Sequence, residues 1–234
     1  MQVVYTFQDR VALVTGATGA LGAAVVKAFA ASGAKVIGVT HSAPPIADDT
    51  THIAYEMADV TDEAAVEPLI ASVVSKFGSL DIVVNTVSGF SAGKPVTDLS
   101  LETWERMLSL NLRSAFLVSK HAGRVMADRH MGRIINVAAR SAYRGKKNAA
   151  AYAVAKRAVI TLTEAQAEET LGLGVTVNAI APSIIDTPAN RAGSPSADTR
   201  RWPTPEQVAR VILFLASDDD VLISGAAIPV YGVA

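Results

Sequence analysis

The sequence predicts an α/β fold, a doubly wound parallel sheet of about seven strands with helices on both faces, in a single domain spanning residues 1–234. Short β-branched runs alternate from end to end with longer stretches that carry apolar residues every three or four positions, which is typical of successive βαβ units. The strands Val11–Val14 and Ile82–Val84 are apolar throughout, which favours a sheet covered on both sides. No composition shift marks a second domain.

Seven strands and five helices follow in order along the chain. Runs rich in Val, Ile and Thr predict strands at Arg10–Thr15, Lys35–Thr40, His52–Glu56, Asp81–Asn85, Arg133–Val137, Val175–Ile180 and Ala226–Val230. Apolar residues at helical spacing predict helices at Leu21–Ser32, Glu63–Phe77, Trp104–Asp128, Ala150–Leu171 and Pro205–Ser217. This order implies parallel crossovers on both faces of one sheet.

Four loops follow strands, so we expect them to meet at the carboxyl edge of the sheet, where such folds bind ligands. They are Ser42–Thr50, Ser88–Thr97, Ala139–Ala149 and Pro182–Pro203. The last is long for a compact domain, which marks residues 182–203 as a candidate lid. Phe90 and Trp202 lie in these loops, either as walls of a substrate site or as anchors of the loops.

The composition indicates a large buried core. Apolar residues make up 50% of the chain and charged residues only 18%, against a typical ~25%, which excludes a disordered chain. With 21 basic and 22 acidic residues the formal net charge is -1, so no excess positive field attracts a phosphate backbone or an anionic bilayer. We therefore expect a small-molecule substrate, with neither nucleic acid nor membrane as partner.

The sequence contains no Cys, which removes disulfides and thiolate chemistry and agrees with a reducing compartment. No apolar run reaches the ~18 residues of a membrane helix, and Met1–Arg10 has no apolar core after a basic start, so we expect a cytoplasmic protein. None of the His residues has a partner at metal-ligand spacing, which predicts no metal site. These residues are His41, His52, His121 and His130.

A glycine-rich turn, Thr15–Gly22, follows the first strand. Gly16 suits a tight turn, Gly19 a close approach of the backbone to a pyrophosphate, and Gly22 close packing of helix on strand. The helix that follows directs its N-terminus at the anion. Strand, turn and helix are the context in which this spacing binds a dinucleotide, although a turn that binds nothing is the alternative. The expected contacts are Gly16, Thr18, Gly19, Leu21 and Gly22.

The residues after the second strand bear on the choice of cofactor. NAD-specific sheets place a carboxylate there, which binds the ribose hydroxyls and repels a 2′-phosphate. This chain has Thr40, followed by His41 and Ser42, although the Arg expected for a phosphorylated ribose is missing. We therefore expect NADP(H) to be preferred over NAD(H). Asp59 is expected either to bind the adenine amino group or to cap the helix beginning near Thr61.

Tyr152 and Lys156 lie four residues apart in a strongly helical stretch, so their side chains share one face. A phenol has a pKa near 10, and an adjacent ammonium together with a cationic nicotinamide would lower it toward neutrality. Such a pair can exchange a proton with a carbonyl or alcohol oxygen while a cofactor handles hydride. By itself this spacing is usually that of a helix surface, and only together with the glycine turn does it favour chemistry.

The chain resembles the short-chain dehydrogenase/reductase family, which has a Rossmann fold, over essentially its whole length. The motifs that carry the resemblance are Thr15–Gly22, Asp59, Asn85, Asn111, Tyr152-x-x-x-Lys156 and Asn178–Pro182. The resemblance implies that Tyr152 is the acid/base, that Lys156 bridges the ribose hydroxyls and that Asn111 supports a water in the proton relay. A helix cap or kink is the alternative for Asn111. It also implies cofactor contacts from Val60, Asn85, Pro182, Ile185 and Thr187.

The chain departs from the family pattern at the site itself. Thirteen residues before its Tyr the family has a Ser that bonds the reacting oxygen, and this chain has Ala139. Losing one such donor costs ~10²–10³ in rate. Three explanations stay open for the missing serine. Ser141 replaces it, Tyr152 acts alone on an activated substrate, or the protein is a weak catalyst. The family's Asn-Asn-Ala-Gly loop also differs, since Asn85–Ser88 keeps only the first Asn.

In several of these departures the chain resembles the dihydropteridine reductase branch of the family. That branch has an Ala where the family has its Ser, an aromatic residue in the loop after the fourth strand, and a lid similar to Asp186–Arg191. Its quinonoid substrate accepts hydride without strong polarisation. Members of the branch carry the acid that Thr40 replaces here, which argues against a close match.

The leading hypothesis is an NAD(P)(H)-dependent reductase of a small carbonyl or quinonoid compound, with Tyr152 as acid/base. The alternative is a cofactor-binding scaffold or regulator with little or no activity, which Ala139 favours. The helices Trp104–Asp128 and Ala150–Leu171 carry apolar residues on more than one side. The family pairs these helices across a two-fold axis, so we expect a homo-oligomer, a tetramer or a dimer.

Overall fold

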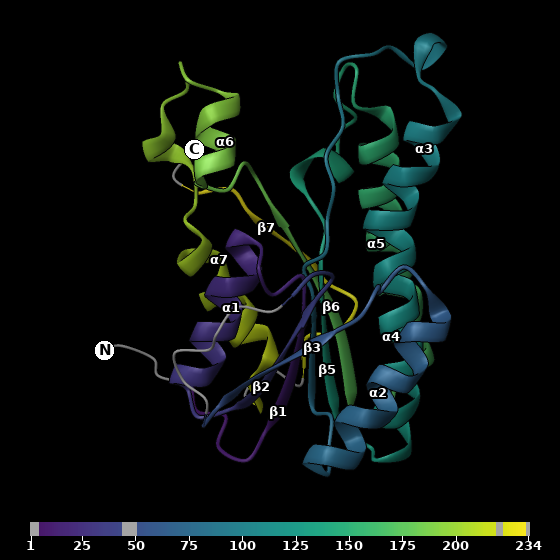
Figure 1. The fold of residues 1–234 in the computed structure, drawn as a ribbon, viewed down its shortest axis with the longest axis vertical. Helices are drawn as coiled ribbons and strands as arrows, with labels where there is room; N and C mark the ends of the chain where they lie inside the picture. The colour runs from purple at the N-terminus through teal and green to yellow at the C-terminus, as the bar shows by residue number, and fades with distance from the viewer. Residues whose placement is uncertain (1–4, 44–50, 219–221, 233–234) are drawn as a thin grey trace.

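A computed structural model describes residues 5–43, 51–218 and 222–232. It contains one parallel sheet with the strand order β3-β2-β1-β4-β5-β6-β7, shown in Figure 1. The order reverses between β1 and β4, which is the point where doubly wound sheets bind their ligands. The strands are β1 (Val11–Thr15), β2 (Lys35–Thr40), β3 (Ile53–Met57), β4 (Ile82–Asn85), β5 (Gly132–Val137), β6 (Val175–Pro182) and β7 (Ala227–Val230).

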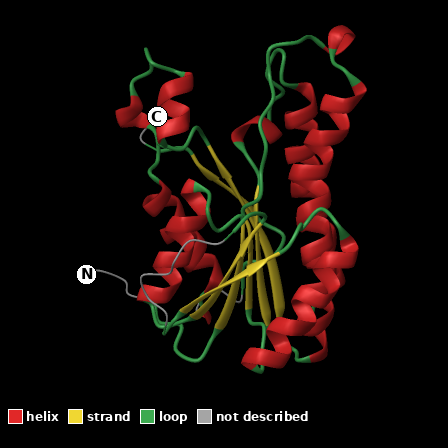
Figure 2. Cartoon of the chain, viewed as in Figure 1, coloured by secondary structure: helices red, strands yellow, loops and turns green. Residues whose placement is uncertain are grey.

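Helices cover both faces of the sheet, as Figure 2 shows. One face carries α1 (Ala20–Ala31) and α7 (Pro205–Ala216), which pack against each other. The opposite face carries α2 (Glu63–Phe77), α4 (Ser114–Asp128) and α5 (Ala150–Glu169). The predicted doubly wound fold is therefore confirmed, and its strand and helix ends agree with the predicted ones to within a few residues except in two regions.

The buried strands pack a separate core on each face. On the α1 side Phe29 is fully buried, with its ring 5.0 Å from that of Phe7. On the other side Leu13, Val83 and Ile134 pack under α2 and α4. Neighbouring residues of one strand thus face opposite cores, which explains why these strands are apolar at every position rather than at alternate ones.

The predicted helix Trp104–Asp128 is wrong as a single element. It consists of α3 (Leu101–Leu108), a π-helical turn at Ser109–Arg113 and α4. Inside the turn, the Asn111 Nδ2 donates to the Met107 carbonyl at 2.9 Å, and the Ser114 hydroxyl donates to the Leu110 carbonyl at 2.7 Å. Two side chains thus compete for backbone acceptors of the helix, which is a known cause of such irregularities.

The segment Pro182–Pro203, predicted as a loop, contains regular secondary structure. Pro182 is the last residue of β6, and the segment contains the short helix α6 (Pro188–Gly193). The Thr187 hydroxyl accepts from Asn190 N at 3.2 Å, so Thr187 is the N-cap and Pro188 the first helical residue. This Thr-Pro start signal was present in the sequence and overlooked.

The remaining loops follow the strands as predicted, and residues 44–50 of the Ser42–Thr50 loop lie outside the described part of the chain. Within the described ranges, no helix combines the length and the apolar character that crossing a bilayer requires.

Candidate active site

The glycine turn joins β1 to α1 at the carboxyl edge of the sheet. Gly16 has a φ of +64°, and a Cβ at Gly22 would lie 2.1 Å from the Gly16 carbonyl oxygen, so neither position accepts a side chain without a shift of the backbone. Gly19 is the N-cap of α1 and offers no side-chain cap. Thr18 is exposed beside it and Leu21 is partly buried. The turn thus forms an open backbone cradle before a helix N-terminus, which fits a pyrophosphate.

The loop after β4 packs directly on this turn. The Thr86 hydroxyl donates to the Thr15 carbonyl at 2.6 Å, and the Thr86 N–H donates to the Thr15 hydroxyl at 3.2 Å. A Cβ at Gly16 would lie 3.2 Å from the Val87 nitrogen. The glycine turn and the loop beginning at Thr86 therefore border the same space at the switch point of the sheet.

Asn85 contributes its side chain to the interior of the sheet. Its Nδ2 donates to Asn136 Oδ1 at 2.8 Å and to Ser119 Oγ at 3.0 Å, and Asn136 in turn donates to Thr163. The Asn85 Oδ1 is buried and finds no hydrogen-bond partner among the described residues. The amide nitrogen uses both of its hydrogens within this network, and the amide oxygen is buried. Only the backbone of Asn85 is therefore available to contact a ligand.

The expected adenosine site lies at the ends of β2 and β3. Thr40 is buried and its hydroxyl donates to the Ser42 carbonyl at 2.7 Å, whereas His41 is largely exposed. Asp59 accepts from the backbone and the hydroxyl of Thr61 at 2.9 and 2.7 Å, which lowers its pKa. Asp59 is not the cap of α2, because Asp62 fills that position. Val60 is buried behind it.

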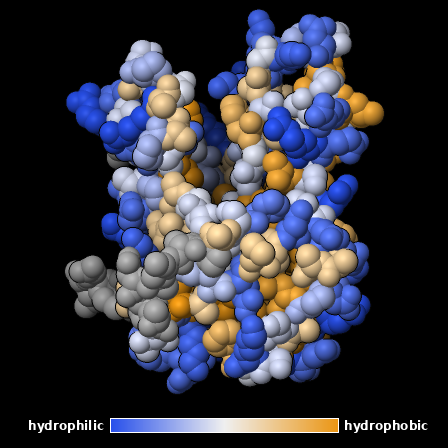
Figure 3. Space-filling view, in the orientation of Figure 1, coloured by the Kyte–Doolittle hydropathy of each residue, from blue (hydrophilic) through white to orange (hydrophobic). Residues whose placement is uncertain are grey.

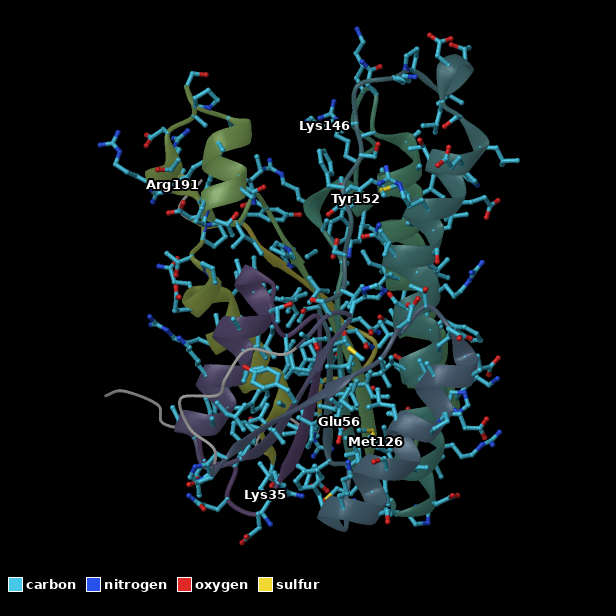
Figure 4. All side chains as sticks on the ribbon, in the orientation of Figure 1. Lys35, Glu56, Met126, Lys146, Tyr152 and Arg191 are labelled. Atoms are coloured by element: carbon cyan, nitrogen blue, oxygen red, sulfur yellow. The ribbon has the colours of Figure 1, made fainter. Side chains whose placement is uncertain are left out.

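Tyr152 and Lys156 lie one turn apart on α5, on the side of the cleft that Figure 3 shows at the carboxyl edge. In Figure 4 the ring of Tyr152 borders this cleft and Arg191 of α6 lies across it. Lys156 is fully buried, with its Nζ 5.9 Å from the centre of the Tyr152 ring and donating to the Val137 carbonyl at 2.7 Å. The structure therefore brings together the two residues that the spacing predicted.

Burial disfavours the charged form of both residues of this pair. Burial lowers the pKa of Lys156 from 10.5 to about 7, since a buried ammonium is poorly solvated. Burial raises the pKa of Tyr152, and a hydrogen bond from the Ser88 side chain acts in the opposite direction. In the cofactor-free protein, burial thus favours the neutral phenol. The lower pKa expected beside an ammonium and a bound cationic nicotinamide stays a prediction.

Asn111 ties the loop after β4 to the π-helical turn and to the end of α3. Its Nδ2 donates to the carbonyls of Gly89 and Met107, both at 2.9 Å. Its Oδ1 accepts from the Ser88 hydroxyl at 2.8 Å and from the Gly89 N–H at 3.3 Å. The Ser88 side chain also lies in hydrogen-bonding reach of the Tyr152 phenol. Asn111 thus reaches Tyr152 through Ser88, a residue that sequence reasoning missed although it departs from the family's loop pattern.

Ala139 is buried at the end of β5, where the family resemblance expects a serine. The Ser141 hydroxyl, two residues on, is buried and makes no hydrogen bond to any described residue. Ser141 therefore does not reach Tyr152 in this structure.

The candidate lid, residues 182–203, contains three of the residues expected to contact the cofactor. Pro182 ends β6, and the carbonyl of Ile185 accepts from Asn190 Nδ2 at 2.8 Å. Thr187 uses its hydroxyl oxygen as the cap of α6, which leaves its O–H able to donate. Asp186 binds Arg191 through two bonds of 2.5 and 2.7 Å. These contacts fold the segment on itself beside the cleft.

Phe90 and Trp202 differ in position. The ring of Phe90 is exposed and packs edge-on against the ring of Tyr152, with centroids 5.1 Å apart and planes at 83°. Trp202 lines a hollow of about 420 Å³ with Pro203, Val211 and Val230. Phe90 therefore belongs to the wall beside Tyr152, and Trp202 to a hollow beneath the lid segment. Among the described residues, no cluster of His, Asp and Glu has a geometry that would hold a metal ion.

Comparison with known proteins defines the class of protein to which this fold and site belong. The family described as Enoyl-(Acyl carrier protein) reductase matches residues 16–232. The chain is similar to the cis-4-hydroxycyclohexanecarboxylate dehydrogenase of Sinomonas cyclohexanicum, with 35% identity over 97% of this chain and 96% of that protein. It is 32% identical to the 3-oxoacyl-(acyl-carrier-protein) reductase FabG of Escherichia coli K12, over 97% of each chain.

Solved structures agree with this assignment. A short-chain type dehydrogenase/reductase from Mycobacterium ulcerans superposes with a TM-score of 0.90 at 30% identity, over 97% of this chain and 90% of that one. ElxO, solved with NADP bound, superposes with the same TM-score at 26% identity, over 95% of this chain and 97% of that one. The chain therefore belongs to the short-chain dehydrogenase/reductase family, as the motifs predicted.

Proposed function

We propose that this protein is an NAD(P)(H)-dependent reductase of a small carbonyl or quinonoid compound, with Tyr152 as the acid/base. The observation that carries the proposal is the convergence of three elements at one edge of the sheet. The glycine turn is a cradle that side chains would fill, the loop after β4 packs on it, and this loop contacts Tyr152 through Ser88 and Phe90.

The residues of the chain then have distinct parts in the reaction. A nicotinamide cofactor, when bound, supplies the hydride. Gly16, Gly19 and the N-terminus of α1 bind its phosphates. Tyr152 donates its proton to the substrate oxygen. Lys156 binds the ribose hydroxyls, and its side chain, once protonated, stabilises the phenolate of Tyr152. The lid of residues 182–203 closes over the nicotinamide with Ile185 and Thr187.

For the cofactor, we propose a preference for NADP(H) over NAD(H). The end of β2 carries Thr40 and the exposed ring of His41 rather than a carboxylate that would repel a 2′-phosphate. The related structure of ElxO has NADP bound. Fluorescence titration of the free protein with NADPH and NADH tests this preference, and tighter binding of NADH would contradict it.

A steady-state assay of cofactor oxidation tests the activity. The panel includes cyclic hydroxy- and ketocarboxylates, 3-oxoacyl thioesters, sugar-derived ketones, quinones and quinonoid pterin. These compounds cover the substrate classes in the names of related proteins and the substrate of the dihydropteridine reductase branch that the sequence resembles. We expect turnover that Tyr152→Phe lowers at least ~100-fold, the usual contribution of a general acid. A wild-type protein no faster than Tyr152→Phe on every compound would refute the proposal.

Ala139 favours a second candidate, a cofactor-binding family member with little or no activity that acts as a scaffold or regulator. Its test is tight binding of cofactor without turnover of any compound on the panel. Ala139→Ser distinguishes a weak enzyme from a scaffold, because a restored donor raises ketone reduction only where the rest of the site is competent.

We further propose that the protein is cytoplasmic and forms a dimer or tetramer through α4 and α5. A hollow of about 560 Å³ lies on this side, lined by apolar residues that include Leu108, Leu112, Phe116 and Leu162. Phe116 is exposed, and burial of such a face across a two-fold axis would remove it from water. Light scattering at micromolar concentration is expected to show an oligomer, and a monomer would exclude this association.

A further inference from the structure

Two departures from the family pattern meet at Tyr152. Ala139 brings a methyl group where the pattern has a serine hydroxyl. In the loop after β4, Ser88 brings a hydroxyl where the pattern Asn-Asn-Ala-Gly has glycine. Relative to the family pattern, the chain thus lacks one hydroxyl, at Ala139, and has an additional one, at Ser88.

Hydrogen bonds and a ring contact fix Ser88 within the loop that packs on Tyr152. The Ser88 hydroxyl donates to Asn111 Oδ1 at 2.8 Å, and Asn111 is buried and fixed to the backbone by two further bonds. Two residues on, the Phe90 ring packs edge-on against the Tyr152 ring at 5.1 Å. The loop is therefore clamped on both sides of Ser88, and the hydroxyl has little freedom except rotation about its own Cβ–Oγ bond.

That rotation gives the hydroxyl two useful states. With Tyr152 neutral, the phenol O–H donates to Ser88 Oγ while the Ser88 hydrogen remains on Asn111. With Tyr152 ionised, the same hydrogen turns to the phenolate oxygen. Asn111 Oδ1 then keeps the Gly89 N–H at 3.3 Å, so no buried acceptor is left empty by the turn. This exchange lets one side chain serve both protonation states of Tyr152.

We propose that Ser88 is the hydrogen-bond partner of the Tyr152 phenolic oxygen during proton transfer, in a site where Ala139 provides no hydroxyl. This inference rests on the proposed function. In the reducing direction the hydride adds to the carbonyl carbon, the phenol proton passes to the carbonyl oxygen, and an alcohol and a phenolate result. The Ser88 hydroxyl donates a hydrogen bond to the phenolate until a water proton restores the phenol. Its influence on the pKa of Tyr152 acts in the same direction.

The test compares Ser88→Ala with Ser88→Thr, which keeps a hydroxyl, and with Ser91→Ala as a matched control in the same loop. Two quantities are measured, the kcat and KM on the best substrate of the panel and the pH titration of tyrosinate absorbance in the cofactor-free protein. Subtracting the same variant carrying Tyr152→Phe isolates the signal of Tyr152. Circular dichroism and the thermal midpoint verify that each variant is folded.

We expect Ser88→Ala to lower kcat about 10- to 100-fold, the usual effect of losing a hydrogen bond to a charged group, with KM nearly unchanged. Its tyrosinate titration and the ascending, acidic limb of its pH profile for alcohol oxidation, where Tyr152 must be ionised to accept a proton, move to higher pH. Ser88→Thr restores both, and Ser91→Ala changes neither. A Ser88→Ala variant that is folded and titrates like the wild type would overturn the inference. Since the titration needs no substrate, it decides the role of Ser88 even if no compound turns over and the proposed function fails.

Discussion

Replacement of the buried ammonium by a thioether, Lys156→Met, gives the sharpest physical test of the site. Lys156 is fully buried, and its pKa falls from 10.5 to about 7 on folding. Since the folded pKa is depressed, the unfolded chain binds more protons between pH 7 and pH 10.5, so the wild type gains stability as pH rises through that window. Below pH 7 Lys156 is protonated in both the folded and the unfolded chain. There the burial of its charge lowers the free energy of unfolding by the full amount, about 5 kcal/mol.

The measurable quantity is a difference of differences. Between pH 7.5 and pH 9.5 the free energy of unfolding of the wild type should rise by about 2.5 kcal/mol relative to Lys156→Met. Loss of the bond to the Val137 carbonyl is a pH-independent cost and cancels. Urea unfolding followed by circular dichroism, without cofactor and at fixed protein concentration, gives both values.

Lys27→Met, on the exposed side of α1, is the matched control and should leave the pH dependence unchanged. A difference between wild type and Lys156→Met that stays constant over these two pH units would refute the reasoning, because it would mean that the ammonium keeps its charge inside the folded protein.

Three further outcomes are expected. Gly22→Ala places a methyl group 2.1 Å from the Gly16 carbonyl oxygen, so fluorescence titration should show loss of cofactor binding. An unchanged affinity would mean that the glycine turn does not bind the cofactor phosphates. Phe29→Ala empties the α1 core and should lower the free energy of unfolding by about 3–5 kcal/mol in urea; a loss under ~1 kcal/mol would contradict its burial. His41→Asp puts a second carboxylate beside Asp59 and should weaken NADPH about tenfold while sparing NADH; equal effects on both would argue against a 2′-phosphate there.

The sequence predicted those parts of the site whose chemistry depends on short-range spacing. Gly16, Gly19 and Gly22 lie within one turn and one helix start, so their roles follow from local backbone geometry. Tyr152 and Lys156 share a helix face because four residues make about one turn. The central strands Val11–Val14 and Ile82–Val84 were predictable because they are buried on both faces, and such burial favours apolar residues at successive positions.

Other parts depend on contacts between distant segments, which spacing does not encode. Ser88 and Asn111 are joined by a bond across two elements, and the sequence offers Ser88 only as an odd residue in a loop. The π-helical turn at Asn111 arises because side chains compete for backbone carbonyls, whereas the apolar periodicity runs through it uninterrupted. The raised pKa of the Tyr152 phenol in the cofactor-free protein was not predictable for a similar reason, since burial is a property of the whole fold.

The irregular turn between α3 and α4 has a consequence for tolerance to insertion and deletion. Each residue of a regular helix rotates its successors by about 100°, and a π-helical turn accommodates one residue more than the regular ladder. Removing a single residue from Ser109–Arg113 would take out this extra residue and let α3 and α4 continue as one regular helix, with little change in their relative rotation. The wide turn that directs the Asn111 amide to the carbonyls of Gly89 and Met107 would be lost, so this position should tolerate substitution of its neighbours far better than any change in length.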